Sequence, residues 1–394
     1  MKKKSFKLFG LALAAALTLA ACGDGEEQKP GGDEHEVVVL NPEQDGVNVS
    51  DPSENNQGDD GSEEVEEVDV IPDGMYRSEL TNEIISKDLE NLRPVAVMVD
   101  NEITALPHFG TSKADIVYEM MNSTANGRIT RLMCIMKDWK SIEQLGSIRS
   151  TRPTNIMVAA EYNAILIHDG GPYYINEYIK KDYTDNLSSG FGRFPNGKAM
   201  EYTEYVTYDT YRNPETGAVY DGLQARIDKA GYSETYNSHY QGPHFQFTWK
   251  DQILSQTVNG AFEVRDVKLP FPHNQSELHY NGDTKLYEYY EYGNKYQDAG
   301  NNNAPLAFKN VIIMKCSFHQ YDEKGYLIYN ILVGQPWEGY LLQSGEAVKI
   351  GWQKLGEEAQ TIYTYEDGTP ITLNTGKTYI AIVPDDTWNT LELK

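Results

Sequence analysis

Cysteine is scarce in this chain of 394 residues, which contains only Cys22, Cys134 and Cys316. Three cysteines are too few for a disulfide framework, and no C-x-x-C pair is present that would indicate a redox or zinc motif. Cys134 and Cys316 lie within the apolar runs RLMCIMK and VIIMKCS, which are typical of buried strands. We therefore expect both to be buried free thiols.

Positive charge is also scarce. The 34 lysines and arginines face 59 aspartates and glutamates, which gives a formal net charge of -25. The acidic excess is not confined to one end, because residues 76–394 alone carry a formal charge of -12. Proteins that bind nucleic acid neutralise its phosphates with basic patches, so this charge balance argues against nucleic acid as a partner.

No apolar run is long enough for a membrane span of about 20 residues. The longest, LFGLALAAALTLA, follows the cationic start MKKKSFK and ends in LAAC, residues 19–22. Small residues between such a run and a cysteine are typical of a lipoprotein signal peptide, so residues 1–22 are predicted to be that signal and Cys22 the lipidated residue. A plain secretory signal is the alternative. The protein is thus expected to be lipid-anchored on the extracytoplasmic side of the cell membrane.

Residues 23–75 contain 18 acidic residues and one lysine, with abundant Gly, Asn, Gln, Pro and Ser. A segment of this composition buries too little apolar surface to offset the entropy of ordering it, and its like charges extend it. We predict an acidic disordered tether, of a length that suits the thick wall of a single-membrane bacterium. An acidic docking tail for a basic partner is the alternative.

Motifs of common catalytic sites are missing as well. The chain has no GxxxxGK[ST], no GxSxG and no HExxH sequence. No grouping of His, Asp and Glu has a spacing that predicts a metal site. We therefore expect no metal and no cofactor, and the sequence assigns no catalytic residue.

Two kinds of pattern divide the remainder of the chain. Residues 76–258 alternate strand and helix patterns: a buried strand at 93–101, a hairpin from 114–123 and 128–138, a helix at 152–163 and a strand at 164–171. Residues 259–394 contain short strands separated by Asp/Gly turns. We predict an α+β protein with an N-terminal α/β sheet domain, followed by a smaller, mostly β domain that is barrel- or sandwich-like.

Several motifs resemble the YerB-like lipoproteins. They occur in the family's order, and they are RPVAVMVDN (93–101), GTSKADIVYE (110–119), RITR (128–131), GSIRSTRP (146–153), HDGG (168–171) and GWQKL with YEDGTPITLNTGKTYIAIVP (351–384). The pair Ser147-Ile148 departs from the family's pattern. The resemblance covers nearly all of residues 93–384 and implies a surface lipoprotein of two domains with no established activity.

The stretch GSIRSTRPTN carries the main functional hypothesis. Arg149 and Arg152 lie three residues apart with Ser150 and Thr151 between them, and Pro153 fits the first position of a helix. Unpaired N–H groups and the helix dipole favour an anion at such a terminus, and guanidinium groups add charged donors. We predict a site for phosphate, sulfate or carboxylate.

Other residues are expected to converge on this site, because ligands collect beyond the carboxyl ends of strands in open α/β sheets. Besides Arg149, Ser150, Thr151 and Arg152, the predicted anion site contains Asn101, Arg131, His168, Asp169, Gly170, Gly171 and His244. The competing interpretation is structural, with the arginines acting as counter-ions for Asp100, Asp115 or Glu119.

Three classes of function remain open. The favoured one is an envelope module that binds an anionic ligand or a partner protein. The second is an enzyme acting on envelope phosphate esters or diphosphates, in which Arg128, Arg131, Arg149 and Arg152 neutralise the phosphoryl group and Asp100, Asp115 or His168 serves as base or metal ligand. The third is a structural interaction protein. Six tyrosines between Tyr280 and Tyr296 suggest either an exposed aromatic platform or strand packing.

Overall fold

The structure is a computed structural model that describes residues 69–394. The predicted signal peptide, the lipidation site Cys22 and most of the tether predicted at 23–75 lie outside the described residues. The described residues 69–394 form one compact unit. Within residues 69–394, no helix combines the length and the hydrophobicity that a bilayer crossing requires.

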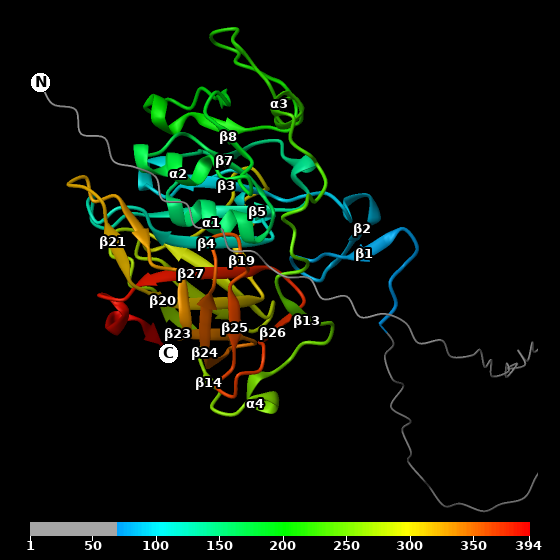
Figure 1. The fold of residues 1–394 in the computed structure, drawn as a ribbon, viewed down its shortest axis with the longest axis vertical. Coiled ribbons are helices and arrows are strands. Elements are labelled where there is room, and N and C mark those ends of the chain that lie inside the picture. The colour runs from blue at the N-terminus through cyan, green and yellow to red at the C-terminus, as the bar shows by residue number, and fades with distance from the viewer. Residues whose placement is uncertain (1–68) are drawn as a thin grey trace, which may run out of the picture. The chain divides into compact units, whose positions relative to one another are not determined.

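One large mixed sheet organises this unit (Figure 1). Its strands follow the order β14-β24-β23-β20-β27-β4-β5-β3-β7-β8, and β25 pairs with β24 beside this path. In chain order they are β3 (Val95–Asp100), β4 (Ile116–Met121), β5 (Thr130–Met136), β7 (Ile165–His168), β8 (Asn186–Ser188), β14 (Phe262–Glu263), β20 (Asn310–Cys316), β23 (Val333–Gln343), β24 (Glu346–Lys354), β25 (Ile362–Thr364) and β27 (Thr378–Pro384).

A separate antiparallel sheet has the order β18-β17-β16-β15-β28, with β19 paired to β17. Its strands are β15 (Asp266–Lys268), β16 (Glu277–Asn281), β17 (Leu286–Glu291), β18 (Asn294–Lys295), β19 (Ala307–Phe308) and β28 (Glu392–Leu393). The smaller sheets are formed by β1 (Met75–Arg77) and β2 (Ile84–Ser86), by β6 (Leu145–Gly146), β9 (Gly192–Arg193) and β10 (Glu204–Val206), by β11 (Tyr211–Arg212) and β12 (Val219–Tyr220), by β13 (Gln246–Thr248) and β26 (Thr372–Asn374), and by β21 (Phe318–Gln320) and β22 (Leu327–Tyr329).

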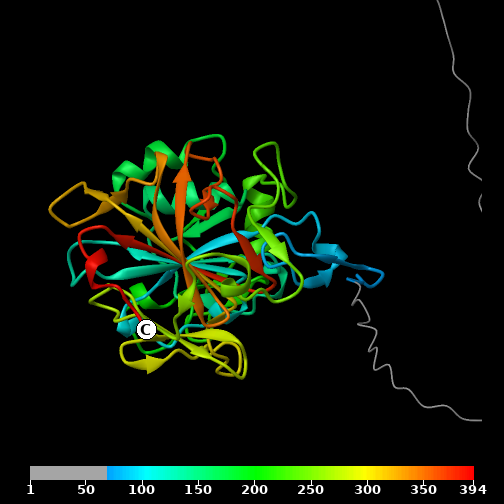
Figure 2. The same ribbon diagram turned by 90° about the horizontal axis from the view of Figure 1, so that it is seen from below.

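Short helices and the antiparallel sheet cover the two faces of the large sheet (Figure 2). The helices are α1 (Pro153–Glu161), α2 (Asn176–Ile179), α3 (Leu223–Ala230) and α4 (Leu254–Thr257). Successive side chains of a strand point to opposite faces, and β3 illustrates the result. Ala96 and Met98 pack in the core that contains α1, whereas Val97 packs in the core shared with the antiparallel sheet.

The predicted α+β class is confirmed, and so are the elements that bear on the site. The buried run at 93–101 is β3, and the predicted hairpin is the antiparallel pair β4 and β5. Its turn places Asn126 at φ 51° and Gly127 at φ 66°, in the left-handed region that Asn and Gly tolerate best. The helix predicted at 152–163 is α1, which begins at Pro153.

The pairing of β27 with β4 joins the two halves of the chain in one sheet (Figure 1). Thr378 pairs with Ile116 in a parallel register, so the last strand of the sheet lies beside the first strand of the hairpin. No pattern in the sequence predicted this contact. The domain boundary placed between residues 258 and 259 stays a prediction.

The two cysteines expected to be free are confirmed as buried free thiols, Cys134 in β5 and Cys316 in β20. Burial raises the pKa of both thiols above the ordinary value, which keeps them protonated at neutral pH.

Candidate functional site: an arginine pocket at the edge of the large sheet

The arginine stretch lies beside the carboxyl end of β3. Arg131 at the start of β5 is the direct cross-strand partner of Asp100 at the end of β3. The chain then returns after β6, where Asp100 N donates to Ser147 O at 2.9 Å and Arg149 N to Met98 O at 3.0 Å. The backbone therefore brings Arg131 and Arg149 to the two sides of one carboxylate.

Three arginines line one cavity of about 720 Å³, here called the arginine pocket. Its lining residues are Asp100, Glu102, Asn122, Ser123, Ala125, Asn126, Ile129, Arg131, Arg149, Ser150, Arg152, Glu201, Tyr202, Lys324 and Tyr326. The volume lies within the range of about 300–1,000 Å³ that is usual for small-molecule sites, but the lining is mainly polar.

Asp100 is the buried counter-ion of this pocket. Its Oδ2 lies 2.9 Å from Arg149 Nε, and its Oδ1 lies 3.9 Å from Arg131 Nη2. Neither contact has the geometry of a hydrogen bond, and both carboxylate oxygens of Asp100 are buried without a hydrogen-bond partner. Asp100 therefore acts as a counter-ion, as the structural interpretation of the sequence predicts. Its single negative charge faces two guanidinium groups, those of Arg131 and Arg149.

Arg131 is the least satisfied of the three arginines. Its side chain is only 8% exposed, yet Nε and Nη1 have no hydrogen-bond partner among the described residues. Burial lowers the pKa of Arg131, and the adjacent positive charge of Arg149 lowers it further, whereas Asp100 raises it. Buried donors without partners are costly and rare in folded proteins. These two nitrogens have almost no accessible surface, but Arg131 is among the residues that line the open cavity.

Arg152 has no carboxylate partner in the part of the chain that the structure describes. Its Nη1 donates to Thr151 O at 2.8 Å and its Nε to Asn122 O at 3.3 Å, while its guanidinium lies 4.3 Å from the ring centroid of Tyr326. Burial first, and then the charge of Arg131, lower the pKa of Arg152 to about 10. Arg152 therefore remains charged at neutral pH, and its hydrogen-bond acceptors named above are backbone carbonyls rather than carboxylates.

Arg149 is better compensated. Its Nη2 lies 2.9 Å from Glu201 Oε2, and its guanidinium lies 5.6 Å from the ring centroid of Tyr202. Burial acts to lower the pKa of Arg149, but the charges of Asp100 and Glu201 outweigh it and leave that pKa raised. Glu201 thus occupies a position on Arg149 that an external anion would also favour.

The loop His168–Gly171 adjoins the arginine stretch through its backbone. Thr151 N donates to Gly170 O at 3.0 Å, and Asp169 N donates to Arg149 O at 2.9 Å. The side chains turn elsewhere: His168 Nδ1 contacts Gly170 O at 2.8 Å, and Asp169 Oδ1 accepts from Ser189 Oγ at 2.8 Å. The loop supports the arginine stretch, and none of its residues lines the pocket.

Two predicted site residues lie in other environments. The Asn101 side chain points into a buried network, where its Nδ2 donates to Thr130 Oγ1 at 2.9 Å. His244 is buried beside Glu161 and Thr361, with Nε2 at 2.9 Å from Thr361 O, and burial lowers its pKa. The structure does not bring His244 to the arginine pocket.

The first turn of α1 is not an open anion site. Pro153, Thr154 and Asn155 are buried and do not line the pocket, and Asn155 Oδ1 accepts from Arg152 N at 3.2 Å. Binding of an anion would therefore depend on the arginine side chains rather than on the dipole of α1.

The residues named for the enzyme alternative are divided: Arg131, Arg149, Arg152 and Asp100 line the arginine pocket, whereas Arg128, Asp115 and His168 do not. Arg128 forms a bidentate pair with Asp386 at the surface, and Asp115 accepts from Lys137 N at 2.6 Å. Glu119 lies in the buried network of Asn101, where Thr130, Ser276 and Tyr379 donate to it. Within residues 69–394, no group of three or more His, Cys, Asp or Glu side chains is arranged to hold a metal ion.

The tyrosines between Tyr280 and Tyr296 mainly serve packing. Tyr287 and Tyr289 are fully buried in the core between the two sheets, and Tyr296 is 4% exposed. Their hydroxyl groups bind internal partners, such as Glu119 for Tyr289 and Thr111 for Tyr296. These contacts favour strand packing over an exposed aromatic platform as the role of these tyrosines.

The side of the pocket that Glu201, Tyr202, Lys324 and Tyr326 form was not predicted from the sequence. Glu201 and Tyr202 come from the short helical turn Met200–Tyr202, and Lys324 and Tyr326 from the turn between β21 and β22. These residues lie about 50 and 170 positions from Arg149 in the sequence. No motif or spacing connects them to the arginines, so only the fold reveals the contact.

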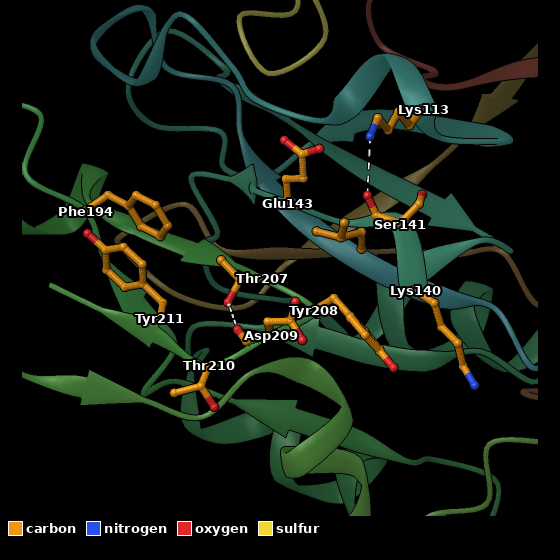
Figure 3. Close-up of a pocket in the computed structure, with 11 residues that line it drawn as sticks. Lys113, Lys140, Ser141, Glu143, Phe194, Thr207, Tyr208, Asp209, Thr210 and Tyr211 are labelled. Carbon is orange, nitrogen blue, oxygen red and sulfur yellow. Dashed lines mark hydrogen bonds between the residues drawn. The ribbon is translucent and has the colours of Figure 1, made fainter.

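A second cavity, of about 600 Å³, is shown in Figure 3. The rings of Phe194 and Tyr211 stack there with centroids 3.8 Å apart, and Lys113 Nζ donates to Ser141 O at 3.3 Å. Lys140 is paired with Glu234 at 2.9 Å. Since its cations already have partners, this cavity offers less to a ligand than the arginine pocket.

The fold and its sequence motifs define a two-part family. The model described as "Protein of unknown function (DUF3048) N-terminal domain" matches residues 80–233, and the corresponding C-terminal domain model matches residues 267–380. The chain therefore belongs to the DUF3048 family.

Two comparisons with Bacillus subtilis proteins agree with this assignment. The chain is 26% identical over 332 residues to "Putative lipoprotein YerB" of strain 168, which covers 81% of this chain and 90% of the relative. The crystal structure of YerB protein matches with a TM-score of 0.62 at 22% identity, covering 81% of this chain and 99% of that chain. The resemblance to YerB-like lipoproteins is thus confirmed.

Proposed function

We propose that this protein is a membrane-anchored extracytoplasmic lipoprotein whose arginine pocket binds a small anionic ligand. The anchoring part of the proposal rests on the LAAC motif at residues 19–22 and on the lipoprotein description of the relative. The binding part rests on Arg131, a buried arginine with two unpartnered donor atoms that lines an accessible cavity.

The charge balance of the pocket supports the same proposal. Its lining contains four cationic side chains and three carboxylates, and one of those carboxylates, Glu102, lies 3.0 Å from His273. Arg131 has to share Asp100 with Arg149, and Arg152 has no ion-pair partner among the described residues. A phosphate, sulfate or carboxylate oxygen between them would give the free guanidinium N–H groups the charge-assisted acceptors that they lack.

Anion titration of the full-length protein tests this proposal. Sodium phosphate, sulfate and acetate are added against sodium chloride at constant ionic strength, and unfolding is followed by differential scanning fluorimetry. A ligand at a hundred times its Kd stabilises the native state by about 2.7 kcal/mol, so at least one anion should raise Tm by several degrees. The increase should diminish as the total salt concentration rises. If no anion shifts Tm beyond the chloride control, the proposal fails.

Glu201→Gln is expected to increase anion affinity about 1.5- to fivefold. Glu201 is 51% exposed and lies 2.9 Å from Arg149, so it competes with an external anion and repels it. An exposed ion pair contributes about 0.2–1 kcal/mol, which sets the scale of the gain. Isothermal titration calorimetry with phosphate measures the affinity. Glu215→Gln removes one charge from an exposed turn remote from the pocket and is the matched control. Unchanged or lower affinity in Glu201→Gln would contradict the competition.

A further inference from the structure

Two exposed tyrosines pack against the buried Tyr174 beside α2. Tyr174 is 7% exposed and stacks on Tyr321, with ring centroids 4.1 Å apart and an interplanar angle of 19°. Tyr321 is 40% exposed, and Tyr173, whose ring packs edge-on against Tyr174 with centroids 5.4 Å apart, is 83% exposed. We call Tyr173, Tyr174 and Tyr321 the tyrosine platform.

The hairpin of β21 and β22 connects the platform to the arginine pocket. Tyr321 N donates to Tyr326 O at 2.7 Å across the turn, which continues the register that pairs Gln320 with Leu327. Residues paired across antiparallel strands lie about 5.5 Å apart or less at Cα, with their side chains on the same face. The ring of Tyr326 lies over the guanidinium of Arg152 within the pocket. Tyr321 of the platform is therefore the cross-strand neighbour of a residue that lines the pocket.

The electrostatic interactions of Arg152, Tyr174 and Asp322 also indicate that the platform lies near the arginine pocket. The charge of Arg152 acts on the hydroxyl of Tyr174, and the charge of Asp322, at the turn of the hairpin, acts on both groups. Because Tyr174 also stacks on Tyr321, a ligand whose anionic group lies among the arginines could extend toward this ring.

The platform is small and flat, and its surroundings are polar. Gln320, Asp322 and His319 adjoin Tyr321 on the hairpin, and Tyr173 and Tyr321 are the large exposed apolar side chains at this place. Two rings are too little for a stable protein interface, which buries about 800 Å² on each partner. A flat ring with polar neighbours suits a sugar, because one face of a pyranose is apolar and its edge carries hydroxyl groups.

We propose that the ligand of the arginine pocket is an acidic saccharide, whose phosphate or carboxylate group binds among Arg131, Arg149 and Arg152 and whose sugar ring packs on Tyr321. This inference rests on the anion-binding function proposed above and adds the class of ligand. A nucleotide also joins an anion to a ring, but its base would require a deeper slot than one face of Tyr321, since Tyr174 covers the other face.

Calorimetric titration of the full-length protein with glucose 6-phosphate, glucuronate and inorganic phosphate tests the assignment. We expect one of the two sugar acids to bind at least about tenfold more tightly than inorganic phosphate. Tyr321→Ala should remove that advantage and leave phosphate binding unchanged, whereas Tyr321→Phe should retain it because the flat ring remains. Tyr220→Ala, which removes a half-exposed tyrosine of β12 outside pocket and platform, is the matched control.

Each outcome decides one of the two proposals. If phosphate binds but neither sugar acid binds more tightly, or if Tyr321→Ala weakens phosphate and the sugar acid equally, the saccharide assignment is wrong and anion binding stands. Tighter binding of adenosine monophosphate or of a triglutamate peptide than of both sugar acids also overturns the assignment. If none of these anions binds, the proposed function itself fails.

Discussion

The double variant Arg131→Gln/Arg152→Gln is expected to lose anion binding almost completely. Each guanidinium would supply charge-assisted hydrogen bonds, which contribute about 1.5–3 kcal/mol, so the double variant should weaken phosphate binding by about a hundredfold or more. Arg149 is left in place because Asp100 and Glu201 already hold it. Isothermal titration calorimetry measures the loss.

The same variant should fold as well as the wild type in the absence of anion. After burial, the charge of Arg131 lowers the pKa of Arg152, as expected for two cations that repel each other in the native state. Removing both relieves this repulsion, so Tm without ligand should change by a few degrees at most. Arg128→Gln is the matched control, because Arg128 precedes the same strand but pairs with Asp386 at the surface. A large loss of stability without ligand, together with unchanged anion affinity, would make the arginines internal counter-ions only.

Lys354→Met is expected to reduce the free energy of unfolding by about 3–5 kcal/mol. Lys354 Nζ lies 2.9 Å from Glu161 Oε1, and both side chains are 0% exposed. Glu161 ends α1 and also accepts from Thr361 N and Oγ1, both at 2.9 Å. Without Lys354, a buried carboxylate would remain at the end of α1, the helix that directly follows Arg152.

Urea unfolding followed by tryptophan fluorescence measures this effect, with Lys349→Met as the control on the same strand. Lys349 is an exposed residue of β24, so its replacement should change stability by about 0.5 kcal/mol or less. The double variant Glu161→Gln/Lys354→Met removes both charges and should recover much of the lost stability. If Lys354→Met alone loses less than about 1 kcal/mol, the pair does not hold α1 against β24.

The elements around the site could be predicted because their signals are local. The run RPVAVMVDN is apolar at residues 95–99, five of the six buried positions of β3, and Asn126-Gly127 provides the left-handed turn of the β4 and β5 hairpin. Pro153 identifies the start of α1 because it fits only a first-turn position. Such signals depend on neighbours within a few residues and need no knowledge of the fold.

The joining of the two halves could not be predicted in the same way. The strand KTYIAIVP is buried at every residue of β27, which is typical of a central parallel strand. That pattern indicates two covered faces but does not identify the neighbours. The pairing of Thr378 with Ile116 is a contact over about 260 residues, and no local pattern encodes its register.

The predicted anion site stays a prediction, and the pocket residues that the sequence singled out for it are mainly contiguous ones. Arg149 and Arg152 were named for their spacing, whereas Asp100 was named only as a counter-ion or as a base or metal ligand. His244 was included because a Pro-His pair in a loop is conspicuous, but the structure pairs its ring with Thr361. Glu201 and Tyr326, which complete the pocket, have no distinguishing sequence pattern, because a single glutamate or tyrosine in a turn is common.

The strand order also determines when the protein can finish folding. Synthesis at about 5–20 residues per second leaves roughly 13–50 seconds between the emergence of β4 and that of β27. During this interval β4 has an unpaired edge rich in Ile, Val, Tyr and Met, a surface that readily joins strands of other chains. The unpaired edge of β4 therefore stays available to strands of other chains until β27 arrives and closes the sheet.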